Sequence, residues 1–216
     1  MTAPPSPIQL VVFDLGRVLV RICRDWQQAC ECAGIRSFNR EVSEADASRL
    51  SKIAHRYDVG GLRAADFTRE AASLMGLSPE QVLAMSDAFI FGPYPGATDL
   101  LAELGDAGVA TACLSNTNEH HWGLLFDRGH RAWLPMDRFK HQFASHLVRA
   151  RKPDEAIYAH VERATNLWGS AILFFDDVTE NLETARKRGW VGEWIDPAPD
   201  EPIGQIRSAL RRHRVQ

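Results

Sequence analysis

The sequence predicts an α/β protein, a doubly wound and Rossmann-like parallel sheet with an inserted all-helical segment. Three observations predict it. Short apolar runs rich in β-branched and aromatic residues recur along the chain, and each stops at a polar residue or a glycine. In the second half, amphipathic helical periods alternate with these runs, which is typical of a parallel sheet covered on both faces. Between residues 25 and 91, by contrast, we find helical periods and no strand pattern.

The composition limits the function. With 216 residues, 45% hydrophobic and 25% charged, the chain can bury one core together with a modest insert. A formal charge of −3 argues against a nucleic-acid partner or an acidic membrane surface. No apolar stretch reaches spanning length, and the proline-rich residues 1–7 lack the apolar core of a secretory signal. Four cysteines suit reduced thiols, so we expect a cytoplasmic protein, monomeric or homodimeric.

The first strand and the helical segment open the chain. The apolar run at 8–13 predicts a buried strand that ends at Asp14. We expect residues 1–20 and 93–216 to form the sheet domain and residues 21–92 the helical one. Helical spacing and capping signals predict helices over 26–32, 41–57, 66–75 and from Ser78-Pro79 onward, followed by a rigid connector over 92–96.

From residue 97 onward, helices and strands alternate. The pattern predicts helices over 97–106, 119–126, 154–165, 180–188 and 202–212. It predicts strands over 109–114, near Phe143-Ala144, over 171–175 and over 192–195. Because crossover helices join successive strands, we expect these strands to be parallel.

Polar side chains follow the predicted strands where each strand ends, and in a parallel sheet these positions meet at one edge. They are Asp14, Ser115, Asn116, Lys152, Asp176 and Asp177. Carboxylates gathered at one edge repel one another unless a cation lies among them, and Mg²⁺ prefers such oxygen ligands. A hydroxyl, an amide and a lysine beside the ion suit a phosphoryl group, which a carboxylate can attack to form an aspartyl phosphate.

These residues carry a family resemblance. The motifs Phe13-Asp14-Leu15-Gly16, Leu114-Ser115-Asn116-Thr117-Asn118, Arg151-Lys152-Pro153-Asp154 and Phe175-Asp176-Asp177 resemble, in order, those of the haloacid dehalogenase superfamily, in its phosphatase-like branch with a helical cap. The resemblance implies that Asp14 is the nucleophile and Lys152 neutralises phosphate and nucleophile. It implies that Ser115 and Asn116 bind phosphate. It also implies that Asp14, the Gly16 carbonyl and Asp176 or Asp177 hold Mg²⁺.

Gly16 departs from the usual motif, in which a second aspartate protonates the leaving oxygen and later activates water. A bacterial subgroup with a glucose-1-phosphate phosphatase is similar in having glycine there, but Arg21 and Cys23 depart from its carboxylates. Three accounts stay open: a substrate with a good leaving group; an acid from the cap, such as Asp25, Glu70 or a histidine; or a slow phosphate-binding or regulatory module.

The leading hypothesis is a Mg²⁺-dependent phosphatase acting on a small phosphorylated metabolite such as a sugar phosphate. The alternative enzyme is a metal-free haloacid dehalogenase, against which Asp176-Asp177 speaks because that reaction needs no cation cluster. Arg17 is a candidate contact for the anionic substrate, or forms a surface ion pair. One of His120 and His121 is a candidate for the substrate entrance.

Overall fold

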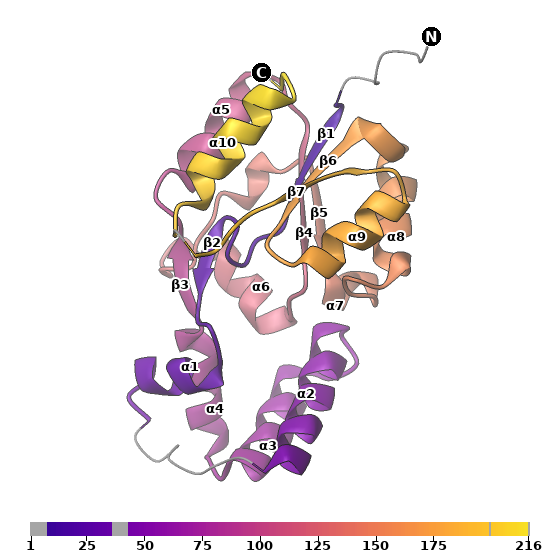
Figure 1. The fold of residues 1–216 in the computed structure, drawn as a ribbon. Helices are drawn as coiled ribbons and strands as arrows, with labels where there is room; N and C mark the ends of the chain where they lie inside the picture. Colours follow the sequence, from indigo (N-terminus) through magenta and orange to yellow (C-terminus); the bar gives the residue numbers. More distant parts are fainter. Residues whose placement is uncertain (1–7, 36–42, 199, 216) are drawn as a thin grey trace.

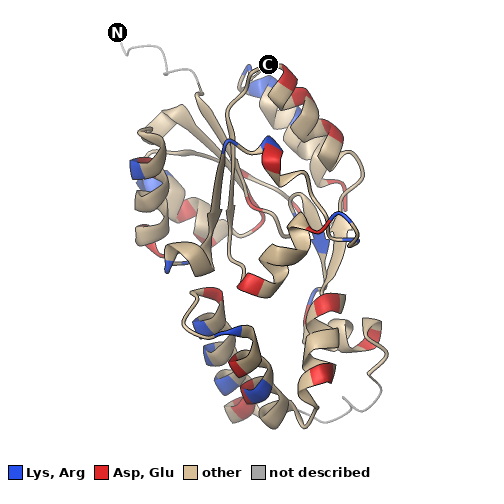
Figure 2. Ribbon diagram, turned by 180° about the vertical axis from the view of Figure 1, so that it is seen from behind, with Lys and Arg blue, Asp and Glu red and all other residues tan. Residues whose placement is uncertain are grey.

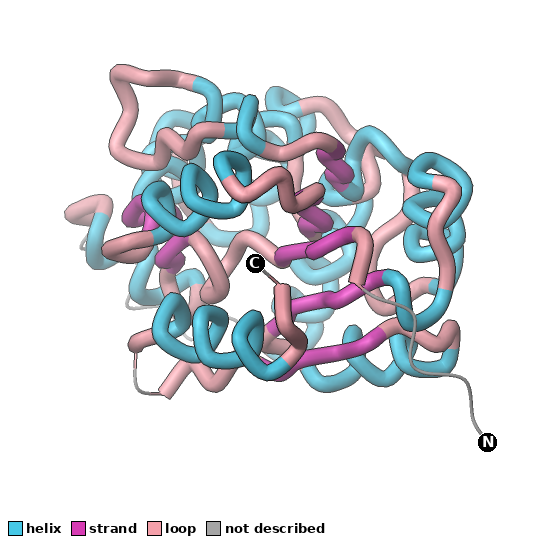
Figure 3. The backbone as a smooth tube through the Cα atoms, turned by 90° about the horizontal axis from the view of Figure 1, so that it is seen from above, coloured by secondary structure: helices cyan, strands magenta, loops and turns pink. Residues whose placement is uncertain are grey.

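The computed structural model describes residues 8–35, 43–198 and 200–215. Its centre is a five-stranded parallel sheet in the order β5-β4-β1-β6-β7, seen along its upper edge in Figure 3. The strands are β1 (Leu10–Phe13), β4 (Thr111–Ser115), β5 (His141–Ala144), β6 (Ile172–Asp176) and β7 (Val191–Trp194). The predicted parallel, doubly wound sheet is therefore confirmed.

Helices cover both faces of this sheet (Figure 1). One face packs against α5 (Ala97–Asp106), α6 (Glu119–Phe126) and α10 (Pro202–Arg212), and the other against α8 (Glu155–Thr165) and α9 (Thr179–Lys187). Successive residues of β1 alternate between the two cores: Val11 and Phe13 lie in one, Leu10 and Val12 in the other. All four are fully buried, which explains why the strand reads as a continuous apolar run.

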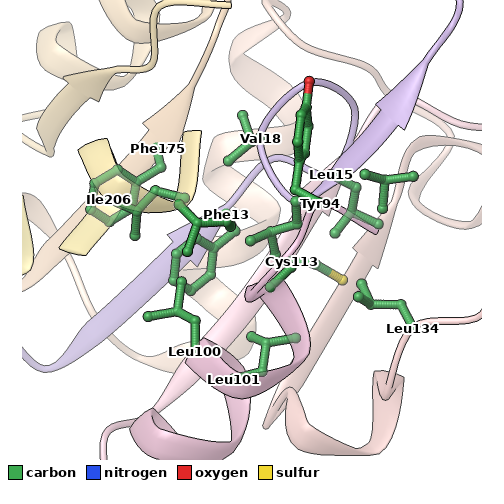
Figure 4. Close-up of a cluster of buried hydrophobic side chains, with 14 of the residues drawn as sticks. Phe13, Leu15, Val18, Tyr94, Leu100, Leu101, Cys113, Leu134, Phe175 and Ile206 are labelled. Atoms are coloured by element: carbon green, nitrogen blue, oxygen red, sulfur yellow. The ribbon is translucent and has the colours of Figure 1, made fainter. Parts of the chain in front are cut away.

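Figure 4 shows the first of these cores in close-up. The rings of Phe13 and Phe175 stack with centroids 5.4 Å apart, and Leu100 and Ile206 pack around them. Burying each large apolar side chain contributes about 1.5–3 kcal/mol. The ends of β1 and β6 are thus held rigidly beside each other.

Four helices form a separate layer below the sheet, which we call the helical layer (Figure 1). They are α1 (Trp26–Cys32), α2 (Glu44–Asp58), α3 (Ala64–Met75) and α4 (Pro79–Ala88), and they share an apolar core of their own. Ser78 and Gln81 form the predicted capping box of α4. The helix expected over 41–57 begins at Glu44 with Ser43 as its cap; residues 41–42, like 1–7, lie outside the described residues.

The expectation of no strand between residues 25 and 91 was wrong. β2 (Val20–Ile22) and β3 (Ile90–Pro93) form an antiparallel pair between the helical layer and the sheet, and β3 replaces part of the expected connector. Strands this short carry no readable alternation, and their pairing joins segments far apart in the chain. The predicted divisions after residues 20 and 92 fall within these strands, so the domain boundaries stay a prediction.

Three further short elements were not predicted: α7 (Ser145–Val148), η1 (Met136–Arg138) and η2 (Gly169–Ala171). α7 contacts the end of α2, where the Ser145 hydroxyl lies 2.6 Å from the Asp58 carbonyl oxygen. The described part of the chain contains no helix long and apolar enough to cross a bilayer.

Candidate active site

The predicted strand-end residues meet at the carboxyl edge of the sheet. Asp14 follows β1, Ser115 ends β4 and Asp176 ends β6, and these three strands are direct neighbours. The backbone N–H of Asp14 donates to the Phe175 carbonyl at 2.8 Å, which extends the ladder to the site itself. The topology of a parallel sheet thus brings together residues more than a hundred positions apart.

Lys152 lies at the centre of the site. Its ammonium donates to Asp14 Oδ1 at 2.7 Å and to Asp176 Oδ2 at 2.6 Å, and its side chain is 1% exposed. The Asn116 amide holds the Lys152 backbone from both sides: Nδ2 donates to the Lys152 carbonyl at 2.9 Å, and Oδ1 accepts from the Lys152 N–H at 2.8 Å. The side chain of Asn116 is therefore committed to positioning Lys152, which leaves its backbone N–H for the phosphate contact predicted from the sequence.

Three carboxylates surround this ammonium. Asp14, Asp176 and Asp177 each offer an oxygen, and these oxygens lie within 4.8 Å of one another. Of the three carboxylates, Asp176 accepts the most hydrogen bonds. Its Oδ1 accepts from the Val178 N–H at 2.8 Å, and both of its oxygens accept from Asn181 Nδ2, at 3.0 and 3.1 Å. Asp177 is ion-paired only at 3.7 Å, with Arg17, so its oxygens are the more available to a cation.

The electrostatics of the site show a shortage of positive charge. Burial raises the pKa of Asp14, and although Lys152 opposes it, Asp176 and Asp177 add to the rise, so the pKa is raised to about 7. Burial, with Asp176 beside it, also raises the pKa of Asp177. The two neighbouring carboxylates hold the Lys152 pKa above its ordinary value despite burial. One lysine does not balance three carboxylates, and a divalent cation on hard oxygen ligands fits this donor set.

Gly16 borders a small pocket beside Asp14, of about 90 Å³. The wall of this pocket is mostly apolar and includes Ile22, Phe89, Leu125, His121 and Ser115. A Cβ placed on Gly16 would lie 3.0 Å from Ile22 Cδ1, so the Ile22 side chain fills the space that an acid at position 16 would enter. Sequence reasoning missed Ile22 because its place depends on the β2–β3 pair.

The cap acids suggested by the sequence do not line this pocket. Glu70 pairs with Arg56 at 3.1 Å and lines an outer groove, and Asp25 caps α1 by accepting from the Gln28 N–H. His121 lines the pocket, while the expected place of one of the two histidines at the substrate entrance stays a prediction. Its Nε2 donates to the Ser86 carbonyl at 3.0 Å, and burial lowers its pKa to about 4, so the ring is neutral near pH 7.

Fold and site together define a protein whose parallel sheet gathers three carboxylates around a buried lysine at its carboxyl edge. The family comparison is specific: residues 8–189 match the model described as haloacid dehalogenase-like hydrolase, and the chain belongs to that family. It is 28% identical over 191 residues to the sesquiterpene phosphatase astK of Aspergillus oryzae, covering 87% of this chain and 89% of that protein.

Solved structures show the same fold. A HAD family enzyme of Bacteroides thetaiotaomicron, bt-2542, superposes with a TM-score of 0.79 at 23% identity, covering 91% of this chain and 97% of that one. Its wild-type complex with magnesium and inorganic phosphate gives a TM-score of 0.75 at 23% identity over 88% and 95%. L-2-haloacid dehalogenase of Xanthobacter autotrophicus superposes with a TM-score of 0.61 at 20% identity, covering 97% of this chain and 84% of that one.

Proposed function

We propose that this hydrolase is a Mg²⁺-dependent phosphatase of a small phosphorylated metabolite, with Asp14 as nucleophile. The observation that carries the proposal is the Lys152 ammonium between Asp14 and Asp176, with Asp177 alongside. The relative astK is a phosphatase, and bt-2542 was crystallised with magnesium and phosphate, which supports this choice. A metal-free dehalogenation gives no reason to gather three carboxylates. The free cysteines suit a reducing compartment such as the cytoplasm.

In the proposed reaction, an Asp14 oxygen attacks phosphorus as the bond to the leaving oxygen breaks, giving an aspartyl phosphate. Water then attacks phosphorus, which releases inorganic phosphate and restores Asp14. Lys152 neutralises Asp14 and the phosphoryl oxygens, while the Ser115 hydroxyl and the Asn116 N–H orient the phosphoryl group. Arg17, beside Asp177, adds positive charge at the entrance.

Asp14, Asp177 and the Gly16 carbonyl are the groups we assign to Mg²⁺, with Asp176 as the residue that holds Lys152. The cation supplies charge neutralisation of the phosphoryl oxygens when it is bound. The pocket beside Gly16 contains no carboxylic acid among the residues that line it. The leaving oxygen therefore takes its proton from water, which favours substrates whose leaving oxygen is weakly basic.

Phosphate release from p-nitrophenyl phosphate, with and without Mg²⁺, tests this proposal. We expect turnover that requires Mg²⁺ and disappears in Asp14→Asn. Turnover that survives this substitution excludes the Asp14 mechanism. Thermal stabilisation by phosphate without release from any ester would identify a phosphate-binding module instead, and halide release without Mg²⁺ would identify a dehalogenase.

A further inference from the structure

The helical layer encloses a cavity of about 650 Å³, within the range of about 300–1,000 Å³ typical of small-molecule sites. Its wall is built largely from apolar side chains of all four helices. They include Trp26, Leu50, Ala54, Phe67, Met75 and Met85. Trp26, on this wall, is 36% exposed and so presents part of its ring to a ligand.

The charged residues on this cavity are already paired within the protein. Asp25 accepts from the Gln28 N–H at 2.8 Å as the cap of α1. Asp58, at the end of α2, is ion-paired with Arg151 at 3.5 Å. Further charged side chains of α2 and α3 line an outer groove, where Arg49 pairs with Asp46 and Arg69 with Asp66. Figure 2 shows how densely these two helices are charged. The cavity itself therefore offers a ligand mainly apolar contact.

A row of aromatic rings joins this cavity to the pocket at the nucleophile. Trp26 lines the cavity and lies 5.6 Å, centroid to centroid, from Phe89. Phe89 lines the pocket beside Gly16 and stacks on His121 with centroids 6.0 Å apart. Phe89 of the small pocket thus contacts Trp26 of the cavity, and these rings form an apolar surface along which a leaving group held at the small pocket would extend toward the cavity.

We propose that the substrate is a phosphomonoester whose leaving part is an elongated apolar group, bound along the Trp26–Phe89–His121 wall into the helical layer. This inference rests on the proposed function and names its substrate class. The pocket offers a hydroxyl-rich sugar polar partners at Ser115, Asn116, Thr117 and His121, but hydroxyls that face Ile22, Phe89 and Leu125 would stay unpaired, which is costly. We therefore expect sugar phosphates, which the sequence left as one possible substrate, to be poor substrates.

A series of 4-n-alkylphenyl phosphates, from methyl to octyl, tests this class because the phenol basicity stays constant along the series. With Mg²⁺ present and concentrations below micelle formation, we expect kcat/KM to rise about three- to four-fold per added methylene until the cavity is filled. A 4-(glucosyloxy)phenyl phosphate should stay near the value for phenyl phosphate. A flat or falling series overturns the inference, while turnover of phenyl phosphate itself would still support the proposed function.

Binding provides a readout that does not depend on turnover. Calorimetry with n-octylphosphonate and methylphosphonate in Mg²⁺ should show much tighter binding of the octyl compound. If no ester is hydrolysed but the octyl preference persists, the proposed function fails and the apolar site stands. Equal binding of the two phosphonates overturns the apolar site.

Matched variants on α2 locate the effect. Ala54 lines the cavity, and Ala54→Phe should remove most of the octyl advantage. Ala45→Phe, on the exposed face of the same helix, should leave both the octyl advantage and phenyl phosphate turnover unchanged. Melting followed by circular dichroism checks folding. Ala47 is exposed and also lines the cavity, so Ala47→Phe replaces Ala54→Phe if that variant does not fold. A full octyl advantage in a folded cavity variant contradicts the proposal.

Discussion

The contact between Gly16 and Ile22 yields a prediction about proton supply. In the double variant Gly16→Asp with Ile22→Val, a carboxyl group stands beside the nucleophile and the methyl group in its way is removed. Ile22 Cδ1 is the atom that lies 3.0 Å from a Cβ on Gly16, and valine lacks that atom. The loss of one methylene at this half-buried position costs about 0.5–1.5 kcal/mol of stability, which a folded domain tolerates.

The expected gain depends on the leaving group. General acid help is typically worth about 10²–10⁴-fold for an oxygen that needs a proton, and little for one that does not. The double variant should therefore hydrolyse alkyl phosphates about 10²-fold faster than the wild type. It should hydrolyse p-nitrophenyl phosphate at nearly the wild-type rate. Gly16→Asp alone should gain less, because Ile22 must first rotate away.

The assay is kcat/KM against the pKa of the leaving alcohol, for the wild type, both single variants and the double variant in Mg²⁺. The wild type should show a steep decline as the leaving oxygen becomes more basic, and the double variant a shallower one. Ile22→Val is the matched control and should keep the wild-type slope. A flat wild-type profile, or a double variant whose slope equals that of the wild type, would refute the reasoning.

Two further predictions concern the ion cluster. Because Asp14 has a folded-state pKa raised from 3.8 to about 7, the metal-free protein should lose stability, by up to about 4 kcal/mol, as pH rises through that window. Chemical denaturation at pH 5 and 8 should show more than half of this loss, because the remainder occurs below pH 5. Mg²⁺ should reverse the loss at pH 8, and Asp14→Asn should lack it. A metal-free stability that rises with pH counts against the prediction. Asn116→Ala should lower kcat by about 10²-fold with a smaller change in KM, because the Lys152 backbone loses the two hydrogen bonds that position it. Steady-state kinetics measures both constants. A change in KM alone would instead indicate that Asn116 contacts the substrate.

Much of the fold and the meeting of the site residues follow from the sequence. Buried parallel strands read as short apolar runs, and polar residues at their ends must share an edge, so the approach of Asp14, Ser115 and Asp176 needed no coordinates. The helices expected over 97–106, 119–126 and 202–212 appear with these limits. Local periodicity and capping chemistry decide such elements.

What the sequence could not predict depends on contacts between distant segments. Nothing in a local pattern shows that the Asn116 amide binds the backbone of Lys152 rather than a ligand, because that choice depends on how two loops meet. The place of Ile22 beside Gly16 depends on a three-residue strand too short to be recognised. Roles that arise from tertiary packing are therefore visible only in the structure.

The glycine at position 16 links the chemistry of the site to its choice of substrate. A carboxyl group there would meet the Ile22 side chain and would add a charge to a pocket whose wall is mostly apolar. With glycine, the pocket keeps this wall, and Phe89 extends it by a ring contact to Trp26. Under the proposed function, the loss of a general acid and the gain of apolar surface are then one structural change. We expect an enzyme built this way to give up proton transfer to the leaving oxygen and to bind an apolar leaving group more tightly in return.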